Sequence, residues 1–334
     1  MSVPTLRLIR KLALGAGLLA AAAVPFAARA AESLKIGTVV WVGYGPFYVA
    51  DKLDLYKKHG LKVSLQFFSD PALIPPALAG GSIDGAMLTY DQVVASDAKG
   101  LKHRVVMPID FSNGGDAIVA EAAVKSVADF KGKKVGFNPL SPSDFLLAYA
   151  LQKNGMGAKD IESINMTPEG IPGAMASGSL PVGVTYEPNV SQILALGGGG
   201  KFHVVFSSKD APGLITDVLV FDEKVIAKRG KAIQALIQGY VDGMAYMKAH
   251  PEESAEIIGK VLGVSAAEAK EQMSGVYNIP LAEMMTNFTP SEQTTSFHGS
   301  GAVIGKILVD NGQIPAVPDF AKTYDAQFVK ALAP

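Results

Sequence analysis

The chain has 334 residues, of which 49% are hydrophobic and 18% are charged, and its formal net charge is −1. This is the composition of a globular protein long enough for two domains. The chain contains no cysteine, which excludes disulfides, thiolate chemistry and a lipidated cysteine anchor. It also lacks a basic run interleaved with aromatics, so nucleic acid is not an expected partner.

The first 30 residues carry the pattern of a secretory signal. Three basic residues precede an apolar run over residues 12–24, and Ala28 and Ala30 are the small residues that a signal peptidase reads. The run is shorter than the roughly 20 residues that a membrane span needs. Cleavage after Ala30 leaves 26 basic and 31 acidic side chains, a net charge of −5. We therefore expect an exported periplasmic protein with no lipid anchor.

Strand and helix patterns alternate along the next 90 residues. Pro46 suits the first turn of a helix, Gly60 suits a helix stop, and Asp91 suits a helix cap. Alternation of this kind predicts parallel strands with helices on both faces. In chain order we predict a strand at 34–41, a helix at 46–60, a strand at 61–68, a helix at 71–81, a strand at 82–90, a helix at 91–100, and strands at 103–112 and 116–120.

The alternation of strands and helices restarts after residue 120, and one short sequence motif occurs twice. The segment "GSIDGAMLTYD" at 81–91 is matched by "GSLPVGVTYE" at 178–187. Each copy is a strand that enters a helix, so the two copies indicate the same corner in two similar α/β lobes. The second set comprises predicted strands at 128–137, 162–167, 181–186 and 201–208, and helices at 141–155, 169–178 and 187–197.

After a strand at 216–221 the sequence becomes mostly helical. Apolar positions recur at helical spacing, which core packing explains. The predicted fold is α/β, with two lobes that are each a mostly parallel sheet flanked by helices, and a helical C-terminal part. The predicted helices there span 224–250, 251–263, 265–275, 290–312 and 319–332.

Ligands of open α/β sheets bind at the carboxyl ends of the strands, where helix N-termini offer free N–H groups. Four aromatic residues stand at such corners, and each could instead be packed core with its polar atom satisfied by the backbone. They are Trp41, the only tryptophan, with Tyr44, Tyr90 and Tyr186.

Acidic residues stand at the same corners, without a lysine or arginine beside them. Asp91 and Glu187 could cap helices, whereas Asp116 follows a glycine corner and Asp217 is a weaker candidate. Together these acids favour a ligand that carries an amine or another hydrogen-bond donor. Ser141 and Ser143 could cap a helix, hold an oxyanion, or do both.

Enzyme signatures are mostly missing from the sequence. There is no Walker loop, no GxSxG elbow and no HExxH motif, and the five histidines lack metal-ligand spacing. We therefore expect no catalytic residues, no metal and no cofactor.

Six motifs, in order, resemble one family: "GYGPFYVADKLDLYKKHGLKV", "GGSIDGAMLTYD", "SNGGDAIVA", "DFKGKKVGF", "SDFLLAYALQKNGM" and "SGSLPVGVTYEP". They resemble the periplasmic solute-binding proteins of ABC importers, in the branch for nitrate, sulfonates, taurine and thiamine precursors. The resemblance implies a two-lobed Venus-flytrap fold in which lobe one is formed by 31–118 and 216–334 and lobe two by 119–215. The segments 116–120 and 216–221 would be the crossing strands.

The same resemblance implies a small-molecule solute as ligand, a monomer, and a membrane permease with its ATPase as partners. One departure is Pro181, where the family usually has an acid, and no basic residue is evident to hold nitrate or a sulfonate. The implied ligand-binding residues are Trp41, Tyr44, Gly45, Thr89, Tyr90, Asp91, Asn113, Asp116, Ser141, Ser143, Tyr186 and Glu187.

Two other functions stay open at the level of sequence. A ligand-sensing module for a membrane receptor would have the same fold and a different partner. An enzyme that makes the thiamine pyrimidine is less well matched, because the cysteine-rich patch of that branch is missing.

Overall fold

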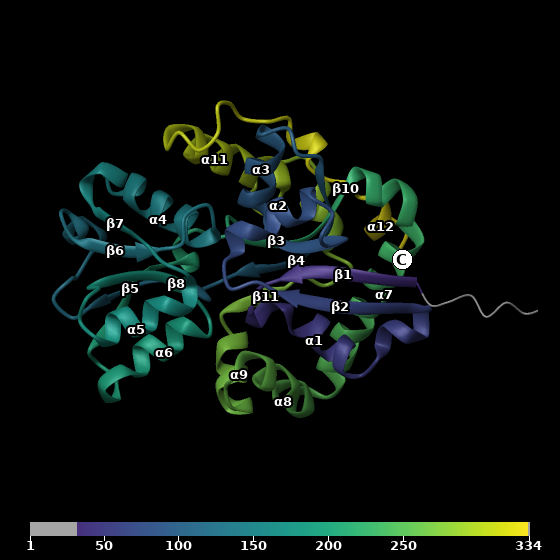
Figure 1. Cartoon of the computed structure of the whole chain (residues 1–334), viewed down its shortest axis with the longest axis horizontal. Coiled ribbons are helices and arrows are strands. Elements are labelled where there is room, and N and C mark those ends of the chain that lie inside the picture. Colours follow the sequence, from purple (N-terminus) through teal and green to yellow (C-terminus); the bar gives the residue numbers. More distant parts are fainter. Residues whose placement is uncertain (1–31, 333–334) are drawn as a thin grey trace, which may run out of the picture. The chain divides into compact units, whose positions relative to one another are not determined.

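A computed structural model describes residues 32–332, so the predicted signal peptide lies outside the described residues. Two groups of strands, each flanked by helices, make up this part of the chain (Figure 1). The first sheet has six strands in the order β11 (Val276–Asn278), β4 (His103–Ser112), β10 (Thr216–Asp222), β3 (Gly85–Thr89), β1 (Glu32–Thr38) and β2 (Leu61–Phe67). The second sheet has five strands in the order β7 (Glu162–Asn165), β6 (Lys134–Phe137), β8 (Val182–Tyr186), β5 (Asp116–Glu121) and β9 (Phe202–Ser207).

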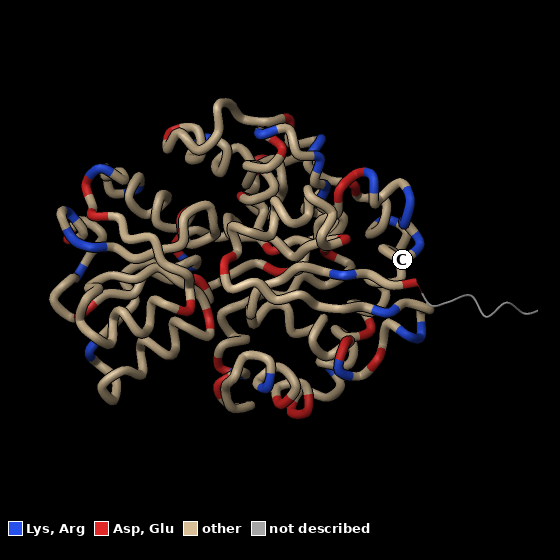
Figure 2. The backbone as a smooth tube through the Cα atoms, viewed as in Figure 1, with Lys and Arg blue, Asp and Glu red and all other residues tan. Residues whose placement is uncertain are grey.

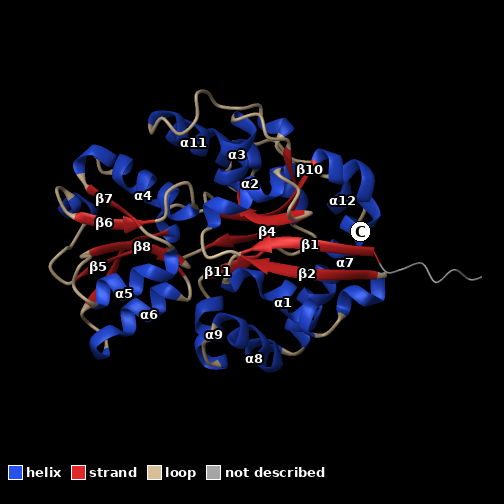
Figure 3. Cartoon of the chain, in the orientation of Figure 1, coloured by secondary structure: helices blue, strands red, loops and turns tan. Residues whose placement is uncertain are grey.

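Helices cover both sheets (Figure 3). Those between the strands are α1 (Gly45–Lys52), α2 (Ile74–Ala79), α3 (Tyr90–Ala98), α4 (Pro142–Lys153), α5 (Ile171–Ala176) and α6 (Asn189–Ala195). The C-terminal set is α7 (Glu223–Ala249), α8 (Pro251–Leu262), α9 (Ala266–Met273), α10 (Met284–Phe288), α11 (Phe297–Asp310) and α12 (Gln327–Lys330). Among the helices of residues 32–332, none is both long and apolar enough to cross a bilayer.

The fold class predicted from sequence is confirmed, with one difference in the strand directions. Strand β1 pairs in parallel with β2 and β3, but β10 runs antiparallel to both β3 and β4. In the second sheet β6 pairs in parallel with β7 and β8, whereas β5 is antiparallel to β8 and β9. Both sheets are therefore mixed rather than mostly parallel. The reason is that β5 and β10 enter their sheets from the other sheet and not through a helical crossover.

Several predicted helices are shorter than their sequence patterns suggested, and three of them illustrate the reasons. The first, at 46–60, ends at Lys52 because Asp54 adopts a left-handed conformation with φ of 55°, and a 3-10 turn completes the segment. The helix predicted from 290 begins only at Phe297, where the Ser296 hydroxyl accepts a hydrogen bond from the free N–H of His298. The last segment, 319–332, forms a 3-10 turn and the short α12 instead of one helix.

The chain passes between the two sheets twice, and a hydrogen bond between two serine hydroxyls joins the two connections. All of β5 belongs to the second sheet and all of β10 to the first, so residues 113–115 and 208–215 are the crossing segments rather than the strands themselves. The hydroxyls of Ser112 and Ser208 lie 2.9 Å apart, and Gly114 N–H donates to Ser208 at 2.6 Å. The predicted boundaries at residues 118, 119, 215 and 216 stay a prediction.

Candidate functional site

A pocket lies where the carboxyl ends of β1 and β3 meet the second sheet. The strands β1 and β2 pair in parallel, and in Figure 3 both of their arrowheads point toward the second sheet. The volume of the pocket is about 20 Å³, which is close to the space of one water molecule. A solute of several heavy atoms therefore needs the walls to separate before it can enter. The lining residues come from both sheets: Val39, Trp41, Tyr44, Pro71, Ile74, Met87, Leu88, Thr89, Gln92, Asp116, Pro142, Tyr186 and Asp217.

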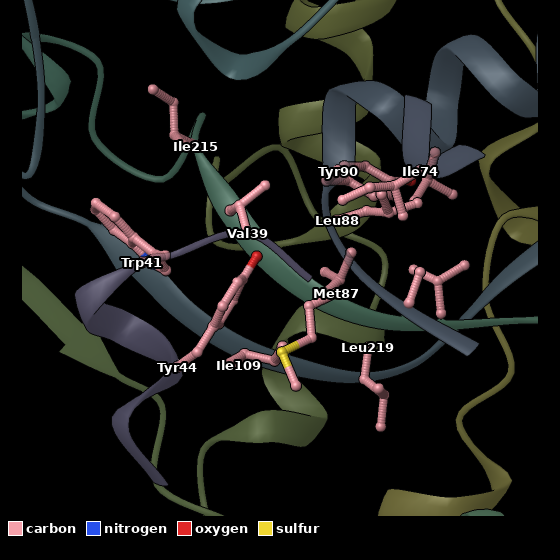
Figure 4. Close-up of a cluster of buried hydrophobic side chains, with 14 of the residues drawn as sticks. Val39, Trp41, Tyr44, Ile74, Met87, Leu88, Tyr90, Ile109, Ile215 and Leu219 are labelled. Atoms are coloured by element: carbon pink, nitrogen blue, oxygen red, sulfur yellow. The ribbon is translucent and has the colours of Figure 1, made fainter. Parts of the chain in front are cut away.

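Three aromatic residues predicted from sequence meet in this pocket. The rings of Trp41 and Tyr186 meet edge to face, with centroids 5.9 Å apart. The hydroxyl of Tyr44 donates to Asp217 Oδ1 at 2.5 Å, and Figure 4 shows it directed at the β10 ribbon between Trp41 and Met87. The hydroxyl of Tyr186 is buried and has no hydrogen-bond partner. A buried hydroxyl without a partner is costly, which marks it as a contact that a ligand can complete.

Behind the aromatics, two strands place carboxyl groups opposite each other. Asp110 of β4 lies opposite Asp217 of β10 in the antiparallel pairing. The two residues are 0% and 4% exposed, respectively. The indole N–H of Trp41 lies 3.4 Å from both oxygens of Asp110. Burial raises the pKa of both carboxyls, and the charge of Asp110 raises the pKa of Asp217 further. Two adjoining buried carboxyls cannot both ionise, so the pair holds a proton at neutral pH.

A third carboxyl, Asp116, lines the pocket from the start of β5. It is 3% exposed, and its own N–H donates to Ser112 at 3.0 Å. Burial is the largest cause that raises the pKa of Asp116 to about 7, and the charges of Asp91 and Glu187 add to it. No lysine, arginine or histidine is among the residues that line this pocket. Figure 2 shows acidic segments where the two groups of strands meet, and most Lys and Arg segments on outer parts of the fold.

Glycine gives the carboxyl pair its close contact with the tryptophan. A Cβ added at Gly43 would collide with Asp110 Oδ2 and with Trp41 Nε1. A Cβ at Gly115 would lie 2.5 Å from the far edge of the Trp41 ring. These two glycines let one indole contact both a carboxyl of the first sheet and the crossing segment.

Four further predicted residues lie at helix starts near the pocket. Thr89 precedes α3 and lines the pocket, so it replaces Asp91 as the residue that caps this helix. Asp91, in the first turn, is buried with Oδ1 unpartnered, and burial raises its pKa to about 6. Ser141 caps α4 by accepting from Ser143 N–H at 3.2 Å, while the Ser143 hydroxyl is buried without a partner.

Glu187 and three other predicted residues are not among those that line the pocket. Glu187 accepts from the N–H of Ser191 at 3.0 Å and from its hydroxyl at 2.9 Å, as a helix-capping side chain does. The Tyr90 ring packs 4.5 Å from the Phe297 ring, with its hydroxyl 2.8 Å from that of Thr323. Two more predicted residues do not line the pocket: Gly45, which packs against Ile258 of α8, and Asn113, which is exposed.

Sequence reasoning missed Asp110 and gave little weight to Asp217. Asp110 sits in the phrase "MPIDFS", an acid within a run that reads as a buried strand. An unpaired acid in such a strand is a signal in itself, because burial of a lone carboxylate is costly. Gln92, which donates to the backbone of Pro71 at 3.1 Å, was also not predicted. Within residues 32–332, no group of three His, Cys, Asp or Glu side chains is placed to hold a metal ion.

Both the sequence and the fold of this chain are similar to those of known proteins. A family model described as NMT1/THI5 like matches residues 41–254. The taurine-binding periplasmic protein of Escherichia coli (strain K12) is 23% identical over 326 residues, which covers 92% of this chain and 97% of that protein.

Two solved structures are similar over most of the chain. The periplasmic aliphatic sulphonate binding protein of Escherichia coli has a TM-score of 0.70 and 21% identity, and the match covers 88% of this chain and 97% of that one. The periplasmic nitrate-binding protein of Synechocystis PCC 6803 has a TM-score of 0.66 and 16% identity, with 87% and 84% covered. These likenesses show a shared periplasmic-binding-protein fold.

Proposed function

Because the chain belongs to the NMT1/THI5-like family, we propose that it is the extracytoplasmic solute-binding component of an ABC importer. It captures a small polar organic solute and delivers it to a membrane permease, and it meets the ATPase only indirectly. The observation that carries this proposal is the pocket itself, whose lining comes from both sheets. The relatives named above bind taurine, sulfonates and nitrate according to their names, and they support import of a solute of that size.

Location and assembly belong to the same proposal. The signal pattern at residues 1–30 would direct the chain to the periplasm, where a monomer would work without a lipid anchor. Binding, rather than catalysis, is supported by the names of the relatives, which are those of binding proteins.

The proposed mechanism is closure of the two halves of the fold around the solute. The pocket is too small for a solute unless its walls separate, so binding requires an open form and a closed form. The two crossing segments, tied by Ser112 and Ser208, are the proposed hinge. Closure would bring Tyr186 and Trp41 together around the solute. Of the predicted ligand residues, those that line the pocket are the proposed direct contacts: Trp41, Tyr44, Thr89, Asp116 and Tyr186.

Trp41 makes a direct test available, because it is the only tryptophan and it lines the pocket. Purified protein without residues 1–30 is titrated with taurine, alkanesulfonates, nitrate, bicarbonate, pyrimidines, urea and small amines. A true solute shifts the Trp41 emission and raises the melting temperature. At a hundredfold excess over Kd, the gain in unfolding free energy is roughly 2.7 kcal/mol.

Delivery to a permease needs its own measurement. Vesicles that hold the cognate permease and ATPase should take up the solute only when this protein is added. The variant Tyr186→Ala should bind and deliver poorly, whereas Gln66→Ala, an exposed position on β2, should behave as the wild type. No emission change with any solute in the panel would contradict the solute-binding role. Binding without uptake would favour a receptor partner instead.

A further inference from the structure

We propose that the solute carries a cationic nitrogen, as an ammonium or amidinium group, and that this group binds against Asp217 and Asp116 in the pocket. The inference rests on the proposed solute-binding function and narrows its ligand class. The first observation behind it is the position of the acids. Asp217 and Asp116 line the cavity, and Asp110 lies directly behind, under the Trp41 indole.

The second observation is the charge that surrounds the carboxyl pair. Within the described residues, acids and phenols are the ionisable groups that raise the pKa of the carboxyl pair or whose own pKa the pair raises. They are Asp116, Tyr44, Tyr48, Tyr186 and Tyr240. A basic group near the crossing segment is Lys209, whose side chain runs beside Gly114 and is exposed. A bare anion would enter a pocket where buried carboxyls repel it, whereas a cation would supply the missing countercharge.

The third observation is the aromatic wall. Trp41 and Tyr186 form an edge-to-face pair across the pocket, and the face of an aromatic ring attracts a cation within about 6 Å of its centre. The Tyr44 hydroxyl already donates to Asp217, so it fixes one oxygen of that carboxyl and leaves the other for a ligand N–H. The unpartnered Tyr186 hydroxyl offers an acceptor on the opposite wall.

Burial raises the pKa of Asp110 to about 8 and the pKa of Asp217 well above its ordinary value, so both carboxyls bind protons at neutral pH in the free protein. When the cation binds, the proton of Asp217 leaves to solvent and its carboxylate faces the ligand charge, so the net charge of the site is conserved. Affinity for a fixed cation should then rise with pH across the neutral range, until the ligand itself loses its proton.

Three probes on one carbon chain separate charge from size. Propylammonium is a cation, 3-aminopropanesulfonate is a zwitterion, and propanesulfonate is an anion; acetamidinium adds the second cationic class. Each is titrated at pH 6 and pH 8 by Trp41 emission, and by calorimetry in phosphate and Tris buffers, which together count the protons released. We expect the amine-bearing probes or acetamidinium to bind with release of up to one proton, and propanesulfonate not to bind.

Two isosteric variants test the roles of the two acids. Asp217→Asn removes the charge that meets the ligand, so cation affinity should fall by at least about tenfold and proton release should disappear. Asp110→Asn keeps an acceptor for Trp41 and removes the charge that adds to the raised pKa of Asp217, so cation binding should survive with a weaker pH dependence. Glu256→Gln is the matched control, because Glu256 is an exposed acid of α8. The melting temperature of each variant verifies that it is folded.

Several outcomes overturn the inference. Binding of propanesulfonate in preference to the cations does so, as does cation binding that releases no proton or that Asp217→Asn leaves intact. Failure of every cationic probe at millimolar concentration does so as well. None of these outcomes touches the solute-binding proposal, which fails only if the wider solute panel leaves Trp41 unchanged.

Discussion

Single residues decide what the pocket can hold. The carboxyls of Asp110, Asp116 and Asp217 are buried beside aromatic rings, and desolvation raises the pKa of each one. Ionisation of such buried groups without a countercharge lowers the stability of the folded protein. The chemistry of the site and the stability of the free protein are therefore linked through the same side chains.

The first prediction concerns Asp116 and pH. Its pKa is about 7 in the folded protein and near 4 when unfolded, so the folded state binds more protons between these values. Stability from this carboxyl is consequently greatest at acid pH and is lost as pH rises from about 4 to 7. Asp116→Asn should flatten that slope and gain up to about 4 kcal/mol at pH 8. Urea unfolding at several pH values measures it, and an unchanged slope would contradict the buried-acid assignment.

A second prediction concerns the unpartnered hydroxyl of Tyr186. Tyr186→Phe removes a buried polar atom that has no partner. The free protein should keep its stability or gain about 1 kcal/mol, because the desolvation cost of the hydroxyl is removed. Solute affinity should fall at the same time if the hydroxyl contacts the ligand. A loss of more than about 1 kcal/mol in unfolding free energy would show that the hydroxyl has a partner in the free protein.

At the scale of elements, tight turns and helix contacts hold the site in place. The 3-10 turn Val42–Tyr44 carries the glycine that lets Asp110 approach Trp41. Two side-chain hydrogen bonds join α4 to the end of α11. Gln313 donates to Asp144 at 2.7 Å, and Gln152 donates to Asp310 at 2.7 Å. The helix α4 packs on the second sheet and α11 on α3, so these bonds tie the two groups of strands together.

The third prediction is that Gly43→Ala disrupts the pocket. The added methyl collides with two side chains at once, so Trp41 must turn away from Asp110. The cost should be about 1–3 kcal/mol in unfolding free energy, with a shift in Trp41 emission. Gly173→Ala in α5 is the control, because a Cβ there meets no atom within 4 Å. It should be neutral or stabilising by up to about 1 kcal/mol.

The fourth prediction concerns the bonds between α4 and α11. Gln152→Ala combined with Gln313→Ala should weaken solute binding by roughly 5-fold to 150-fold, because side-chain hydrogen bonds each contribute about 0.5–1.5 kcal/mol. Dissociation rates from stopped-flow Trp41 emission provide the measurement. An unchanged rate would show that these bonds do not favour the closed form.

For the whole molecule, the central expectation is a change between open and closed forms. The pocket of about 20 Å³ sits between elements of two sheets that are connected by two crossing segments. Saturating solute should lower the radius of gyration measured by small-angle X-ray scattering. Ser208→Ala should alter that equilibrium, because it removes bonds to both Ser112 and Gly114. A radius that is the same with and without solute would contradict closure.

The sequence by itself determined the alternation of strands and helices, the two similar halves, and the corners that supply Trp41, Tyr44, Thr89, Asp116 and Tyr186. These features are local, since hydrophobic period, glycine and proline positions and strand-to-helix turns are read within a few residues. The repeated "TY" corner also located both halves of the pocket. It did not distinguish Tyr186, which lines the pocket, from Tyr90, which packs on Phe297.

Only the tertiary structure decided the strand directions, the break of the first helix at Asp54, and the carboxyl pair. Asp110 and Asp217 are far apart in the chain and meet because β4 and β10 pair antiparallel, with a register shift between Asp217 and Val218 beside this pair. A shift of that register by one residue would turn the two side chains to opposite faces of the sheet. No local pattern specifies such a pairing, because it depends on how the chain returns from the second sheet to the first. The side chains at the centre of the proposed chemistry were therefore fixed by long-range strand pairing rather than by any motif.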